Sequence, residues 1–199
     1  MSSSVLYMSM SLDGFVAGPN EGPGNGLGDG GMRLHEWFFE GEPTEHGGVP
    51  GRPGGVNGEV MDELVASGAV VTGRTTFELA GGWGGDHHDG VPIFIVSRGK
   101  PGPEVAEWPL VSFVDDAATA IARAKEAAGE KDVMVHGVTT THLALAAGAL
   151  DELQIHLVPV LLGGGRRLFE QPLAEQPELE LTRVRDGRGV THLRYRVHR

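Results

Sequence analysis

The segment Gly73-Arg74-Thr75-Thr76 combines residue types that suit phosphate binding. It lies between a predicted buried strand over 69–72 and a predicted helix that runs to about residue 80. Backbone N–H groups at the start of a helix attract anions, and the planar guanidinium of Arg74 matches phosphate oxygens. The segment predicts a phosphate site, and a tight turn with a surface arginine is the other interpretation.

Two further strand ends carry polar side chains. The strongly β segment PIFIVS ends at Ser97-Arg98, and a predicted strand over 132–136 runs into His136-Gly137-Val138-Thr139-Thr140. Ligands collect at the carboxyl ends of parallel strands. Ser97 can donate a hydrogen bond and Arg98 can supply charge, unless this is an ordinary polar strand exit. Thr139 or Thr140 is expected to cap the helix that follows.

A short amphipathic segment over 33–40 places Leu34, Trp37 and Phe38 on one face. Aromatic side chains of this kind can pack on a flat heteroaromatic ring. Glu36, on the same segment, is the nearest available carboxylate that could supply a proton to such a ring. The other interpretation is that the Glu36 side chain is simply exposed to solvent. His35 is the weaker candidate of the two.

Asp86-His87-His88-Asp89 resembles a metal cluster by composition. Adjacent residues rarely converge on one ion without help from elsewhere, so a solvated loop is the favoured interpretation and no metal site is predicted. The chain has no cysteine, which excludes disulfides and thiolate zinc sites.

The net charge of −11 argues against a nucleic-acid surface, which would show a basic stripe. Six C-terminal arginines are interpreted as the solvated face of a hairpin; they are Arg183, Arg185, Arg188, Arg194, Arg196 and Arg199. No apolar run of membrane-spanning length and no signal peptide is recognised. A cytoplasmic protein with no membrane partner is therefore expected.

Thirty-two glycines concentrate in two segments, 18–31 and 41–58. Glycine-rich segments in a compact domain suggest mobile loops over a site. The second is as compatible with a poorly ordered surface loop. Gly163 to Gly165 either approach a ligand or turn the chain.

Strands and helices alternate through the middle of the chain. Eight strands are predicted, over 5–12, 69–72, 92–97, 110–114, 132–136, 153–160, 179–185 and 190–198. Helices are expected from an Asn57 cap to about 67, over 74–80, and from an Asp115 or Asp116 cap to 128. A fourth helix is expected from a Thr139 or Thr140 cap to about 147. Alternation implies crossovers and a mainly parallel sheet. We expect one α/β domain over 1–199, a three-layer fold with a mixed eight-stranded sheet and a C-terminal antiparallel hairpin.

Three motifs in order resemble the dihydrofolate-reductase-like family. They are SLDGFVAG (11–18), VTGRTTFE (71–78) and DELQIHLVPVLLGGGRRLF (151–169). The match is closer to the branch related to the reductase of riboflavin biosynthesis, the C-terminal domain of the bifunctional deaminase-reductase. The resemblance covers nearly the whole chain and implies the eight-stranded fold, NADPH as cofactor and a homodimer.

The resemblance also implies roles for the residues. Cofactor contacts are expected from Val16, Ala17, Gly73, Arg74, Thr75, Thr76, Ser97, Arg98, His136, Gly137, Val138, Thr139 and Thr140. Substrate contacts are expected from Asp13, Leu34, Trp37 and Phe38, with Asp13 more simply a turn residue, and Glu36 is the candidate acid. Val138 stands where the family has a second glycine, so either the loop adapts or cofactor affinity is reduced.

The function expected is an NADPH-dependent reductase that transfers a hydride to a small pteridine- or pyrimidine-like substrate. One alternative is the 5-amino-6-ribosylaminouracil-phosphate-type reductase of riboflavin synthesis, whose second phosphate would need a basic pair such as Arg166-Arg167. Another is a nucleotide-binding module without turnover.

Overall fold

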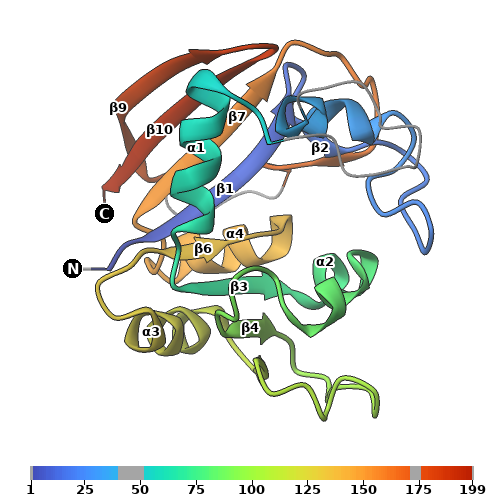
Figure 1. The fold of residues 1–199 in the computed structure, drawn as a ribbon, viewed down its shortest axis with the longest axis vertical. Coiled ribbons are helices and arrows are strands. Elements are labelled where there is room, and N and C mark those ends of the chain that lie inside the picture. Colours follow the sequence, from blue (N-terminus) through green and yellow to red (C-terminus); the bar gives the residue numbers. More distant parts are fainter. Residues whose placement is uncertain (1, 40–51, 171–175, 199) are drawn as a thin grey trace.

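The computed structural model describes residues 2–39, 52–170 and 176–198. An eight-stranded sheet in the order β5-β4-β3-β6-β1-β7-β10-β9 forms its centre (Figure 1). Its strands are β1 (Ser4–Ser11), β3 (Ala69–Gly73), β4 (Ile93–Val96), β5 (Val111–Val114), β6 (Val133–Val135), β7 (Glu152–Val158), β9 (Glu178–Gly187) and β10 (Val190–His198). The pairs from β5 to β7 are parallel, and β10 runs antiparallel to both β7 and β9. The predicted fold class is confirmed.

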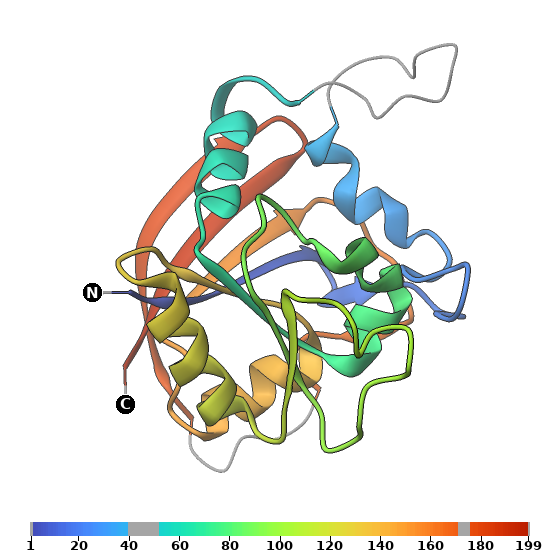
Figure 2. The same ribbon diagram turned by 60° about the horizontal axis from the view of Figure 1, so that its bottom comes forward.

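Two layers cover the sheet, because alternate residues of each strand point to opposite faces. On one face, α3 (Ala117–Ala128) and α4 (Val138–Ala146) bury one set of strand residues, such as Leu6 and Val71. On the other, Leu64 of α1 (Gly55–Val65) and Phe77 of α2 (Arg74–Leu79) pack on the alternate set, which includes Val5 and Val70. Figure 2 shows α1 and α3 on opposite sides of the sheet.

Several short elements are absent from the predicted set. A second sheet pairs β2 (Phe15–Ala17) with β8 (Arg166–Arg167). The 3-10 helix η1 (Gly31–Phe38) occupies the amphipathic segment, and η2 (Gly81–Gly85) follows α2. Asp116 caps α3 by accepting from the Thr119 amide, as one of the two predicted caps. Of the glycine segment 41–58, residues 41–51 lie outside the described residues.

Asn57 does not cap α1, because the helix starts earlier, with Gly54 as its N-cap. The Asn57 side chain is buried and donates to the carbonyls of Trp37 at 3.3 Å and Arg188 at 3.1 Å. Its amide oxygen lies 3.2 Å from Nε2 of His192. One side chain therefore joins η1, α1 and the terminal hairpin.

The C-terminal arginines are not a simple solvated face, which corrects the expectation for three of them. Arg183 pairs with Glu63 and Arg185 with Glu59, both on α1, and Arg194 pairs with Glu152 of β7. These guanidinium groups are therefore partly buried, and carboxylates of α1 and β7 supply the opposite charges that a partly buried cation needs. Arg199 lies outside the described residues.

Candidate active site

A cavity of about 630 Å³ opens at the carboxyl ends of β3 and β6. Its walls come from the glycine loop 18–31, η1, α1, the α2–η2 segment and the start of α4. Seven residues that the sequence predicted as contacts line it: Val16, Ala17, Phe38, Thr76, His136, Gly137 and Val138. A cavity of this volume suits a small ligand or the reactive half of a larger one.

Two glycines let the backbones of α2 and α4 approach each other beside this cavity. A Cβ atom on Gly137, whose φ is +88°, would lie 2.7 Å from the Thr76 hydroxyl oxygen, and one on Gly73 would lie 3.0 Å from that of Thr140. The buried hydroxyls of Thr72 and Thr140 have no hydrogen-bond partner among the described residues. A polar ligand that follows this edge could satisfy them.

Gly137, not a threonine, is the N-cap of α4, and Val138 is its first residue. The positive φ falls on Gly137, so Val138 needs no glycine-like conformation. Val138 is therefore accommodated without backbone strain, and its side chain packs against the core and lines the cavity. Thr139 is exposed.

The predicted phosphate-binding arginines lie outside the cavity, on the neighbouring strand ends. Arg74 donates to Glu78 at 2.7 Å and to the Lys100 carbonyl at 3.1 Å, and so contacts the loop that follows β4. Arg74 also lines a smaller cavity of about 200 Å³. Ser97 hydrogen-bonds Gly99, and Arg98 and Thr75 are exposed. The arrangement gathers Arg74, Arg98 and Lys100 at one edge.

The aromatic segment presents the predicted apolar face, but most of that face packs into the core and not against the cavity. Leu34 is fully buried, and Trp37 is buried with its indole N–H donating to Ser9 at 3.0 Å, so neither lines the cavity. Glu36 is exposed and away from the lining, which removes the geometric basis for it as proton donor. His35 lines the cavity instead, and burial lowers the pKa of its imidazole.

Asp13 acts on the chain rather than on the cavity. Its carboxylate accepts from the amides of Leu162 at 3.2 Å and Gly163 at 2.8 Å and from the Ser11 hydroxyl at 2.6 Å. The Ser11 hydrogen bond, followed by that of Gly163, lowers the pKa of Asp13 to about 2. A Cβ on Gly165 would meet the Ala17 carbonyl at 2.1 Å. The glycine triplet therefore turns the chain and packs on β2.

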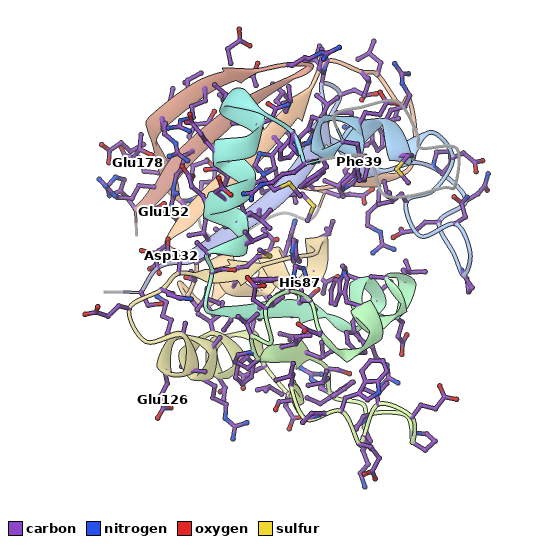
Figure 3. The ribbon with its side chains drawn as sticks, in the orientation of Figure 1. Phe39, His87, Glu126, Asp132, Glu152 and Glu178 are labelled. Atoms are coloured by element: carbon purple, nitrogen blue, oxygen red, sulfur yellow. The ribbon has the colours of Figure 1, made fainter. Side chains whose placement is uncertain are left out.

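His87 and His88 do not form a solvated loop. His87 lines the cavity, its ring centroid 4.6 Å from that of Trp83 and 5.4 Å from that of His136. Figure 3 shows His87 beneath the carboxyl end of α1. Burial, and then the neighbouring His136 and His88, lowers the pKa of His87 to about 3, and burial lowers that of His136 to about 4. No metal-binding cluster exists among the described residues.

The glycine loop 18–31 is internally hydrogen-bonded. The Gly18 amide donates to Leu27 and the Asp29 amide to Pro19. An ion pair of 2.7 Å between Glu21 and Arg166, both lining the cavity, joins the loop to β8. Sequence reasoning missed His87, Trp83 and Glu21 as lining residues, because their pattern alone does not show where these loops fold back.

This sheet order, with a cavity at the carboxyl ends of its central strands, agrees with the expected dihydrofolate-reductase-like fold. The chain belongs to the RibD C-terminal domain family, which it matches over residues 4–193. The expected oxidoreductase class is thereby confirmed, and the family implies a nicotinamide cofactor. None of the curated proteins shows significant sequence similarity to the chain.

Solved structures share the fold at low sequence identity. A putative riboflavin biosynthesis protein from Shewanella sp. PV-4 has a TM-score of 0.70 at 22% identity, with 99% of each chain covered. A pyrimidine reductase-like protein from Corynebacterium diphtheriae has a TM-score of 0.63 at 13% identity, with 100% of this chain and 92% of that chain covered. A diaminohydroxyphosphoribosylaminopyrimidine deaminase/5-amino-6-(5-phosphoribosylamino)uracil reductase from Thermotoga maritima has a TM-score of 0.60 at 14% identity, with 98% and 56% covered.

Within the described residues, no helix has both the length and the apolar character needed to cross a bilayer.

Proposed function

We propose that the protein binds NADPH along the carboxyl ends of β4, β3 and β6 and transfers its hydride to a small heteroaromatic substrate in the 630 Å³ cavity. The observation that carries this is the pair of glycines on adjacent strand ends, Gly73 and Gly137. A Cβ on either glycine would crowd a threonine hydroxyl, Thr76 for Gly137 and Thr140 for Gly73, and the buried hydroxyls of Thr72 and Thr140 have no partner among the described residues. Such an edge suits a ligand backbone lined with phosphate oxygens.

The charges at one end of this edge suit the 2′-phosphate of NADPH. The chain carries −11 overall, yet Arg74, Arg98 and Lys100 gather where β4 ends, next to β3. A 2′-phosphate would lie there, the pyrophosphate between Gly73 and Gly137, and the nicotinamide against Val16 and Ala17. When bound, the cofactor supplies the hydride, and the apolar walls of the cavity exclude water from the transfer.

The substrate class follows from the walls opposite. Met8, Leu64, Phe38 and Trp83 offer apolar and aromatic surface for a flat ring. Arg166 is the one arginine that lines the cavity among the described residues, and Glu21 now neutralises it. This observation favours the narrower alternative, a pyrimidine that carries a sugar phosphate, because such a phosphate could replace the Glu21 carboxylate on Arg166. The Thermotoga maritima protein of the same fold bears the name of such a reductase.

The test compares NADPH with NADH by calorimetry, followed by NADPH oxidation with a panel of pterins and aminopyrimidine ribose phosphates. Tighter binding of NADPH and turnover with a panel member are expected. Equal affinity for both nucleotides would contradict the cofactor proposal. Tight NADPH binding without turnover on any panel member would favour the nucleotide-binding module.

The expected homodimer also finds a candidate surface. Leu179, Leu181 and Val184 of β9 are 44%, 51% and 54% exposed. They pair with Val197, Tyr195 and Leu193 of β10, and so extend one apolar face at the edge of the sheet. Monomers rarely expose apolar patches of this kind without a partner. We therefore propose that two copies associate through this face.

A further inference from the structure

The hydrogen bonds around His88 fix which of its ring nitrogens carries the proton. Its Nε2 lies 3.3 Å from both the carbonyl oxygen and the hydroxyl oxygen of Ser67. The carbonyl can only accept, and the hydroxyl already donates its proton to the Leu64 carbonyl at 2.9 Å. His88 must therefore donate from Nε2, which leaves its Nδ1 as an acceptor in the neutral ring.

This assignment passes to His87. Its Nδ1 lies 2.7 Å from Nδ1 of His88, so whenever the His88 ring is neutral His87 carries its proton there. The Nε2 of His87 is then a bare acceptor, and it has no partner among the described residues. His87 lines the cavity, and a ligand bound there is the partner that we assign to this acceptor.

The neighbouring ring repeats the arrangement. His136 bonds the backbone of Tyr7, and its buried Nε2 has no partner in the described part of the chain. The proton is therefore on Nδ1, and Nε2 is again an acceptor. Two imidazole rings whose centroids are 5.4 Å apart thus present the same hydrogen-bonding character at one wall. Burial keeps both neutral, since it lowers the pKa of each well below 6.5.

We propose that His87, held in its tautomer by His88 and Ser67, is a specificity-determining residue that accepts a hydrogen bond from an N–H donor of the ring bound in the cavity. The inference rests on the proposed function for the identity of that ring as the substrate. The ligand class is a heteroaromatic ring with an amino group or ring N–H on the edge that faces His87 and His136. A ring with only acceptors on that edge is rejected. It would place its own acceptors against the Nε2 lone pairs of His87 and His136, and none of these atoms would then have a hydrogen-bond donor.

A matched pair of probes tests the proposal without turnover. The probes are 2,4-diaminopyrimidine and 2,4-dimethylpyrimidine, which have nearly the same shape, and only the first has N–H donors. Calorimetry is run at a pH above the pKa of the diamino probe, so that both are neutral. The wild-type protein should bind the diamino probe about 10- to 100-fold more tightly. Equal affinity would overturn the proposal.

Variants then assign the preference to His87. His87→Phe keeps a ring beside Trp83 and should lose the preference, as should His88→Leu, which frees the proton of His87. His88→Asn can place its amide oxygen near the position of the His88 Nδ1 atom. Unlike His88→Leu, it should therefore keep the preference. His198→Phe, an exposed histidine on β10, is the control and should behave as wild type. A preference that survives His87→Phe contradicts the proposal.

The tautomers can be measured on the wild-type protein alone. Two-bond ¹⁵N–¹H correlation spectra should show His87 protonated on Nδ1 and His88 on Nε2, and a proton on Nε2 of His87 would refute the assignment. The two proposals fail separately. If NADPH and NADH bind equally but the diamino probe is still preferred, only the cofactor proposal is rejected. If NADPH binds more tightly than NADH but the two probes bind equally, only the role of His87 is rejected.

Discussion

Gly137 and Thr76 approach each other so closely that no side chain fits between them. A Cβ atom on Gly137 would lie 2.7 Å from the Thr76 hydroxyl oxygen, and the backbone of Gly137 has a φ of +88°. The two residues belong to the starts of different helices, α4 and α2, that follow adjacent parallel strands. Only glycine at position 137 allows this close approach at the edge that we propose to hold the cofactor.

Replacing Gly137 by alanine should cost both stability and cofactor binding. Positive φ alone disfavours alanine by about 1 kcal/mol, and the close contact adds to that. Gly129→Ala is the matched control, because Gly129 has a φ of +64° and open space around its Cβ position. Chemical denaturation should show the larger loss for Gly137→Ala, and only that variant should lose NADPH affinity. Equal losses of stability in Gly137→Ala and Gly129→Ala would mean that the contact between the new Cβ atom and Thr76 costs nothing.

Arg98→Ala should weaken NADPH binding by about 1.5–3 kcal/mol, the range for a lost hydrogen bond to a charged group. Its effect on NADH should be small, because NADH lacks the 2′-phosphate. Arg123→Ala on α3, outside the proposed edge, serves as the control. Calorimetric titration of both nucleotides measures the difference, and a parallel loss for NADPH and NADH would place Arg98 away from the 2′-phosphate.

Glu36→Gln should leave the pH–rate profile unchanged, since Glu36 is exposed and does not line the cavity. His35→Phe, on the same 3-10 helix, should instead alter KM, because His35 lines the cavity and Phe preserves its stacking on Phe38 at 5.6 Å. Steady-state kinetics over a pH series distinguish the two. A titration that disappears in Glu36→Gln would restore Glu36 as the acid.

Acidification should destabilise the fold through His87 and His136. Their folded-state pKa values of about 3 and about 4 lie below the usual 6.5. The unfolded chain therefore takes up protons first, and the free energy of unfolding falls as pH drops from about 6.5 toward those values. Each ring contributes a slope of about 1.4 kcal/mol per pH unit in this window. Urea unfolding of His87→Phe between pH 7 and 5 should show a slope reduced by about that amount, whereas an undiminished slope would mean that the pKa of His87 is not lowered in the folded protein.

A charge on the exposed face of β9 should separate the proposed dimer. Val184→Glu places a carboxylate among Leu181 and Leu193, where association would have to desolvate it. Sedimentation should report a dimer for the wild type and a monomer for the variant, with the far-UV spectrum unchanged. Glu178→Gln, on the same strand, is the control. A wild type that sediments as a monomer would reject the face as an interface.

The sequence predicts the elements better than it predicts their contacts. Alternation and apolar runs locate all eight strands of the main sheet, because each strand carries its own burial pattern. Side-chain partners from distant segments are not visible in this way. Arg194 looks solvated until α1 and β7 supply Glu63 and Glu152, which lie 131 and 42 residues away.

The candidate site shows the same division. Gly73, Gly137 and Thr76 are recognisable because strand ends and glycines mark them locally. The choice between His35 and Glu36 depends on a rotation of one residue in η1, which helix periodicity does not resolve for a 3-10 helix. His87 lines the cavity beside His88, which contacts Ser67 just beyond α1, a partner 21 residues away in the chain.

The position of β1 in the sheet also constrains how the protein can be made. This strand is synthesised before both of its neighbours in the sheet, because it lies between β6 and β7, whose residues begin at 133 and 152. At about 5–20 residues per second, β1 waits roughly 7–30 s for β7 to be synthesised. Until β6 is synthesised, Val5, Leu6 and Tyr7 have neither neighbour, and until β7 follows they have only one, so the nascent chain carries an incompletely paired apolar segment.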